Sequence, residues 1–106
     1  MDIELLVVAE CPHAVPAHQL ITTAVADARV QANITRTVIT SEQHAKERGF
    51  TGSPTILLNG ADPFAQPDAR VALSCRLYPT PRGFSGVPAL RDLRQAINRV
   101  AAGQVV

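Results

Sequence analysis

The sequence predicts a single α/β domain, and three observations lead to this fold class. A nearly continuous apolar run over residues 3–9 is typical of a strand buried on both faces of a sheet. Residues 34–40 are rich in β-branched side chains and predict a second strand. Apolar side chains recur at helical spacing between residues 88 and 102. A chain of 106 residues has the length of one domain and can bury a core without disulfide bonds.

Composition and charge exclude several function classes. The formal net charge is +1, so nothing in the balance points to nucleic acid or an anionic membrane as a partner. The first apolar run is too short to span a bilayer, and Asp2 and Glu4 stand where a signal peptide carries positive charge. We therefore expect a cytoplasmic protein, in which thiols are normally reduced. Its two cysteines are then expected to be redox-active, reactive or incidental, and not structural bridges.

A helix is expected after the first strand. Pro12 suits a first helical position, whereas Pro16 inside a helix would remove a hydrogen bond. Either the helix starts near Pro12 and is irregular at Pro16, or its regular part starts near Val15. Helical spacing beyond this point is shared by Leu20, Ile21, Ala24, Val25 and Ala28.

The middle of the chain predicts a short helix and a third strand. Ser41 is a typical N-cap residue, and Gly49 is a typical helix C-terminal residue. Thr55–Leu58 is the expected third strand, and the following Asn59-Gly60 pair indicates a tight hairpin turn.

The last third of the chain alternates loops with two further elements. Residues 61–69 and 79–88 contain several prolines and are expected to be loops. Residues 71–78 are expected to supply the fourth strand, which gives the element order βαβαββα. Residues 88–102 predict the best helix of the chain, with an apolar stripe made of Leu90, Leu93, Ile97 and Val100.

Two motifs in this order resemble the thioredoxin-like superfamily. The first is the tetrad Cys-Pro-His-Ala that begins at Cys11, between a strand and a helix. The second is the stretch RGFTGSPTILLNG at residues 48–60, in which Ser53-Pro54 precedes a strand. The resemblance extends over nearly the whole chain. It implies a four-stranded mixed sheet in the order 2-1-3-4, flanked by helices, with the last two strands antiparallel and a cis peptide bond at Pro54.

Cys11 is the expected nucleophile. A sulfur at a helix N-terminus lies near free N–H groups and the positive end of the helix dipole, and both favour the thiolate. His13 would add to this effect if it were protonated and close. The alternative to a reactive Cys11 is a buried and inert cysteine. In the resembled family, the residue before the cis-proline offers its backbone N–H and C=O to an extended thiol substrate. The resemblance therefore implies a substrate-binding surface made of Pro12, His13, Ser53, Pro54 and Thr55.

Ala14 marks a departure from the family, whose disulfide oxidases carry Cys-Pro-His-Cys. A dithiol enzyme leaves its mixed disulfide by attack from the second sulfur, which this tetrad lacks. Cys75 is the candidate for a displaced resolving thiol, and it reaches Cys11 only if residues 61–74 fold back over the site. A disulfide needs Cα atoms within about 4.4–6.8 Å. The alternative is an unpaired core cysteine on the fourth strand.

Three functions follow from these residues. The first is a thiol-disulfide oxidoreductase that acts through Cys11 on a protein or a glutathione-like small thiol, without a cofactor, and is resolved by Cys75 or by a small thiol. The second is a redox-inactive thioredoxin-like module that keeps the groove for a protein partner. The third is a two-thiol protein that handles a soft metal ion or an organomercurial. No resident metal is expected, because no His or Cys pair has metal-ligand spacing.

Overall fold

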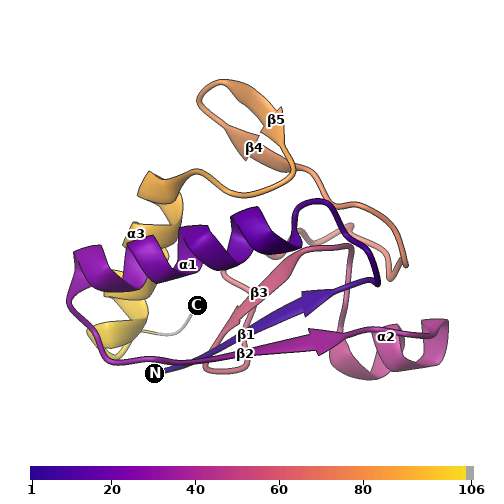
Figure 1. Ribbon diagram of the computed structural model, residues 1–106, viewed down its shortest axis with the longest axis horizontal. Coiled ribbons are helices and arrows are strands. Elements are labelled where there is room, and N and C mark those ends of the chain that lie inside the picture. Colours follow the sequence, from indigo (N-terminus) through magenta and orange to yellow (C-terminus); the bar gives the residue numbers. More distant parts are fainter. Residues whose placement is uncertain (105–106) are drawn as a thin grey trace.

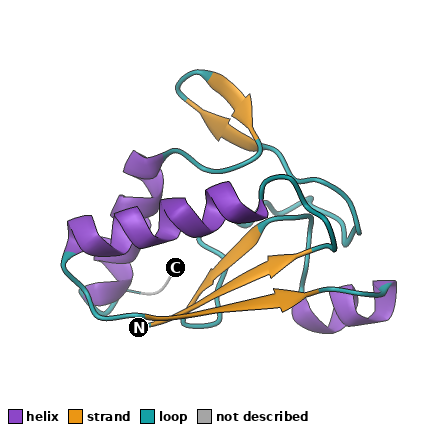
Figure 2. Cartoon of the chain, viewed as in Figure 1, coloured by secondary structure: helices purple, strands orange, loops and turns teal. Residues whose placement is uncertain are grey.

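The computed structural model describes residues 1–104 and contains three helices, a three-stranded sheet and a separate two-stranded hairpin (Figures 1 and 2). The α/β class predicted from the sequence is therefore confirmed. The elements are β1 (Asp2–Val7), α1 (Ala14–Ala28), β2 (Asn33–Val38), α2 (Glu42–Arg48), β3 (Thr55–Leu58), β4 (Tyr78–Thr80), β5 (Gly83–Ser85) and α3 (Leu90–Ala101).

The main sheet has the order β2-β1-β3, with the apolar strand β1 in the centre. β1 runs parallel to β2 and antiparallel to β3, so that Leu5 lies between Arg36 on one side and Ile56 on the other. A central strand has neighbours on both edges and is covered on both faces, which explains why its sequence is apolar except at Asp2 and Glu4.

Helices α1 and α3 cover one face of this sheet (Figure 1). Side chains alternate along a strand, so Ile3, Leu5 and Val7 of β1 all point to this face. They pack with Ile56 and Leu58 of β3 against the apolar stripes of the two helices. The buried helical residues are Ala14, Ala17, Ile21, Ala24, Leu93, Ala96 and Ile97.

Helix α2 covers the opposite face with a smaller core. Leu6 of β1 and Leu57 of β3 point to this side and pack with Ile39, Ala45 and Phe50. Glu4 projects in the same direction as Leu6, where its carboxylate accepts hydrogen bonds from Arg48 at the end of α2 and from Thr37. The bond from the Arg48 guanidinium, with that from the Thr37 hydroxyl, holds the pKa of Glu4 below its usual range.

The expected four-stranded sheet is wrong. Residues 71–77 form no strand, and Tyr78–Thr80 pairs only with β5, in a hairpin that projects away from the main sheet (Figure 1). The predicted turn at Asn59-Gly60 is present, with both φ angles positive, but only Leu58 and Ala61 pair across it. Beyond that pair the chain leaves β3, and the side chain of Arg76 bonds to Thr55 at the other end of the strand. The predicted strand order 2-1-3 is confirmed, and within the described residues no fourth strand pairs with β3.

The helix ends follow local chemistry closely. The Ser41 hydroxyl caps α2 by accepting from the His44 N–H at 3.0 Å, and Gly49 ends the helix with a φ of 62°. α1 begins at Ala14, near the later of the two expected starts. Pro16 then lies in the first turn, where its missing N–H removes no helical hydrogen bond.

Candidate thiol site

Cys11 lies in the loop between β1 and α1. The chain turns at Glu10, whose φ is 58°, and His13 is the N-cap residue of α1. The Cys11 carbonyl accepts from the Ala14 N–H at 3.2 Å, so the cysteine belongs to the turn that leads into the helix. Its side chain is half-buried against the core under α1 and α3, and its thiol is free.

His13 packs against the loop before α3. A Cβ added at Gly86 would meet the imidazole ring at 2.5 Å, so the ring lies directly over this glycine. The His13 side chain makes no hydrogen bond to the N-terminus of its own helix. Its position therefore joins the start of α1 to the segment that follows β5, while Pro12 beside it is exposed.

Ser53 is the residue that joins the parts of the site. It is fully buried and precedes Pro54 through a cis peptide bond, the isomer expected from the sequence. Its Oγ accepts a hydrogen bond from the Val8 N–H at 3.1 Å, which links it to the end of β1. Its backbone N–H donates to the Ser74 carbonyl at 2.8 Å, and its carbonyl accepts from the Arg76 N–H at 2.9 Å. Both backbone groups that the resemblance assigns to an extended substrate are thus taken by the chain itself.

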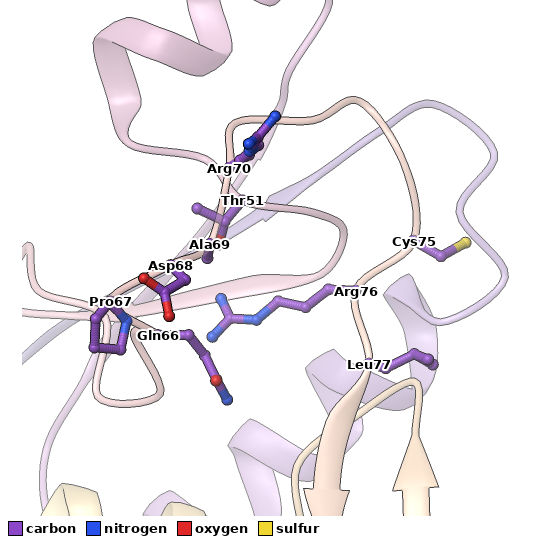
Figure 3. Close-up of a pocket in the computed structure, with 9 residues that line it drawn as sticks. All are labelled: Thr51, Gln66, Pro67, Asp68, Ala69, Arg70, Cys75, Arg76 and Leu77. Carbon is purple, nitrogen blue, oxygen red and sulfur yellow. The ribbon is translucent and has the colours of Figure 1, made fainter.

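These two bonds place Cys75 opposite Ser53 in an isolated parallel bridge. Residues 61–74 therefore fold back onto the turn at Ser53-Pro54. Val8 lies three residues before Cys11, so Ser53 connects the neighbourhoods of both cysteines. In Figure 3 the Cys75 side chain points away from Arg76, toward the loop between β1 and α1. Cys75 is exposed and its thiol is free.

Arg76 is buried beside Cys75 and is held by an ion pair. Its guanidinium donates to Asp62 Oδ2 at 2.6 Å, to the Phe64 carbonyl at 2.6 Å and to Thr55 Oγ1 at 3.3 Å. It also lies over the ring of Tyr78, with Cζ 4.5 Å from the ring centroid. We call Asp62, Phe64, Arg76 and Tyr78 the arginine clamp. Arg76 and Tyr78 therefore lie inside the protein and not on a solvated face.

Tyr78 completes the clamp. Its hydroxyl donates to the Pro54 carbonyl, and its ring meets that of Phe64 edge-on, with centroids 5.5 Å apart. Thr55, the next residue after Pro54, is buried and donates to the Gly52 carbonyl at 2.6 Å. Burial of the phenol raises the pKa of Tyr78 well above its usual value. The Ser53–Thr55 turn is therefore bound on one side by β1 and on the other by the clamp.

An open cavity of about 470 Å³ lies beside the clamp. Figure 3 shows residues 66–70 along one side and residues 75–77 along the other, with the Arg76 side chain extending between them. Arg70 and Asp68 bring opposite charges to its lining, and Thr51 and Gln66 are neutral. The cavity therefore selects for no single charge.

Asp62 and Phe64, which belong to the clamp, have no signal in the sequence. Asp62 follows a turn and precedes a proline, a pattern that predicts a loop and nothing about a buried ion pair. Gly52 stands in the stretch RGFTGSPTILLNG that resembles the thioredoxin-like motif, and the pattern alone assigns it no contact. The structure shows that its φ of 129° and its contact with Arg76 both require glycine.

No family model, curated protein or solved structure matches this chain. Within residues 1–104, no group of three or more His, Cys, Asp or Glu side chains is placed to hold a metal ion. No helix in the same part of the chain is long and apolar enough to cross a membrane.

Replacement of Gly52 should weaken the pairing of residues 74–76 with Ser53. In Gly52→Ala the new Cβ would lie 2.8 Å from Arg76 Cβ and 3.2 Å from Arg76 Cα, at a φ that side chains rarely adopt. We expect a loss of about 1–3 kcal/mol in the free energy of unfolding, measured by urea denaturation. Gly83→Ala is the matched control, because Gly83 has a φ of 101° but open space around it. Equal losses in the two variants would show that the contact with Arg76 contributes nothing.

The Tyr78 hydroxyl should lose its proton at a higher pH than an ordinary tyrosine, because its pKa is raised by burial. The chain has one tyrosine and no tryptophan, so the phenolate absorbance reports Tyr78 alone. We expect a midpoint above the ordinary value of about 10 in the folded protein. Only the unfolded state then loses this proton near that pH, so the free energy of unfolding should fall as the pH rises above about 10. An ordinary midpoint under conditions that preserve the fold would contradict the burial of this phenol.

Proposed function

We propose that this chain is a thiol-disulfide exchange protein of thioredoxin-like type, in which Cys11 is the nucleophile and Cys75 the resolving thiol. The observation that supports the proposal most directly is the pairing of the Cys75 segment with Ser53. This pairing holds Cys75 beside the cis-proline turn, with its thiol directed toward the loop that carries Cys11.

The proposed reaction needs no cofactor. The Cys11 thiolate attacks one sulfur of a disulfide, so that a mixed disulfide forms and the first thiolate leaves. The Cys75 thiolate then attacks the Cys11 sulfur, the second thiolate leaves, and Cys11 and Cys75 are joined. The substrate is thereby reduced by two electrons and the protein is oxidised by two. Two external thiols reverse the sequence.

Cys75 supplies what Ala14 removes from the tetrad. In a Cys-x-x-Cys site, the helix itself carries both sulfurs and sets their separation. Here the second sulfur is carried by a loop, and its position depends on the Ser53 pairing and the arginine clamp. Because both sulfurs belong to one chain, the second attack is intramolecular and proceeds at a high effective concentration.

The alternative of a redox-inactive binding module has less support. Such a module would use the backbone of Ser53 to pair with an extended partner strand. Residues 74–76 already use both of these backbone groups. The third alternative, a soft-metal or organomercurial protein, needs only the two thiols, and no further observation in the described residues favours it over exchange.

The proposed pair is tested by oxidation of the reduced protein. With oxidised glutathione we expect the wild-type chain to lose two hydrogens by intact mass, and peptide mapping to join Cys11 to Cys75. Cys75→Ser should stop at the mixed disulfide of Cys11 with glutathione, because the resolving thiol is gone, and Cys11→Ser should form no internal bond. The oxidised form should resist urea better, by up to about 4 kcal/mol, because the bond closes a long loop. Two free thiols, or two glutathione adducts without an internal bond, would reject the proposal.

A further inference from the structure

We propose that residues 74–76 act as an internal substrate strand, so that the external partners of the thiol pair are small disulfides and thiols and not extended polypeptide segments. This inference depends on the proposed function, because it concerns the substrate class of the same two sulfurs.

The first argument is backbone occupancy. An extended peptide binds beside a strand or turn mainly through main-chain hydrogen bonds, which need a free donor and a free acceptor. Ser53 has one of each, and the Ser74 carbonyl and the Arg76 N–H satisfy both. A peptide could pair there only after residues 74–76 had left. A small disulfide needs no such pairing, because it has no extended backbone.

The second argument is that the clamp opposes this departure. Arg76 is bound at both ends, by its N–H to Ser53 and by its guanidinium to Asp62. Only 7% of the Arg76 side chain and 13% of the Asp62 side chain are exposed. Separation of the pair would leave a buried charge without a partner, which is strongly unfavourable. The conformation in which residues 74–76 have left Ser53, which we call the open form, is therefore a minor state.

The third argument is access for a small partner. Cys11, which meets the external disulfide, is only half-buried, and Cys75 is exposed although its backbone is held, so neither sulfur needs the release of residues 74–76 to be reached. The cavity that it borders carries one positive residue, Arg70, against one negative residue, Asp68, in addition to the paired Arg76. Selection in this site then depends on size and on backbone pairing, more than on the charge of the partner.

The magnitude of the selection follows from the population of the open form. Minor conformations commonly make up about 0.1–10% of a protein. A partner that needs the open form reacts more slowly by the inverse of that fraction. We therefore expect extended peptides to be disfavoured by about 10- to 1000-fold relative to small disulfides.

The test compares two probes on the reduced full-length chain. One is 2-hydroxyethyl disulfide, and the other is the mixed disulfide of 2-mercaptoethanol with an eight-residue peptide that has a central cysteine. Intact mass follows the formation of the Cys11–Cys75 bond. Each rate is divided by the rate of the same probe with free glutathione, which removes its intrinsic reactivity. We expect the normalised wild-type rate to be at least about tenfold lower for the peptide.

Asp62→Asn should reduce this difference, because it removes the charge that holds Arg76. Asp68→Asn is the matched control, since Asp68 is an exposed carboxylate of the same loop that takes no part in the clamp. Amide hydrogen exchange at Ser53 and Arg76 reports the pairing directly. Both amides should exchange faster in Asp62→Asn and remain protected in Asp68→Asn.

The outcomes separate the two proposals. Equal normalised wild-type rates for the two probes overturn the internal-strand proposal, while the disulfide that forms still supports the proposed function. Failure of both probes to produce the Cys11–Cys75 bond rejects the proposed function itself. If Asp62→Asn does not fold, Arg76→Lys takes its place, because lysine keeps the charge but loses the forked contacts. Faster amide exchange with unchanged selectivity in either variant also overturns the internal-strand proposal.

Discussion

The ion pair between Asp62 and Arg76 is the interaction on which the candidate site depends. Arg76 contributes its guanidinium to Asp62 and Phe64 and its backbone N–H to Ser53. A loop without regular secondary structure is thereby held against the turn at Pro54. Besides the guanidinium contacts, two backbone bonds to Ser53 hold residues 74–76 at this turn, since residues 71–77 form no ladder with β3.

Position, more than net stability, is what this ion pair provides. A buried pair loses hydration as it gains attraction, so its net contribution to the free energy of unfolding is often small. Its geometry is nevertheless specific, since a planar guanidinium donates hydrogen bonds to groups near its plane and stacks on groups that lie over its face. Carboxylate, carbonyl and hydroxyl oxygens meet it on its edges, and the Tyr78 ring covers it. Within the described residues no buried side-chain polar atom lacks a hydrogen-bond partner, so the clamp does not lose stability through an unsatisfied polar group.

The sequence predicted the elements whose signals are local and failed where distant contacts decide. The helical stripe through Leu93 and Ile97 and the caps at Ser41 and Gly49 are set by residues a few positions apart, and all are confirmed. The fourth strand was wrong, because the apolar pattern of residues 71–78 gives no sign that Arg76 turns inward. Its partner Asp62 lies fourteen positions away in a proline-containing loop, whose path no periodic pattern describes. The same path brings Cys75 to Ser53 through a fold-back of residues 61–74, which the sequence left open.

A loop-borne second thiol has a physical consequence that a helix-borne one lacks. In a Cys-x-x-Cys tetrad the separation of the sulfurs hardly changes with the state of the surrounding loops, whereas in the proposed pair it would depend on the clamp. The redox state of the proposed pair and the closure of the clamp are then linked, and linkage acts equally in both directions. A closed clamp raises the effective concentration of Cys75 near Cys11 and so favours the disulfide. The disulfide in turn holds residues 74–76 on Ser53 and favours the closed clamp. Oxidation should therefore slow the amide exchange of Ser53 and Arg76 by the same factor by which clamp closure raises the equilibrium constant for the Cys11–Cys75 disulfide.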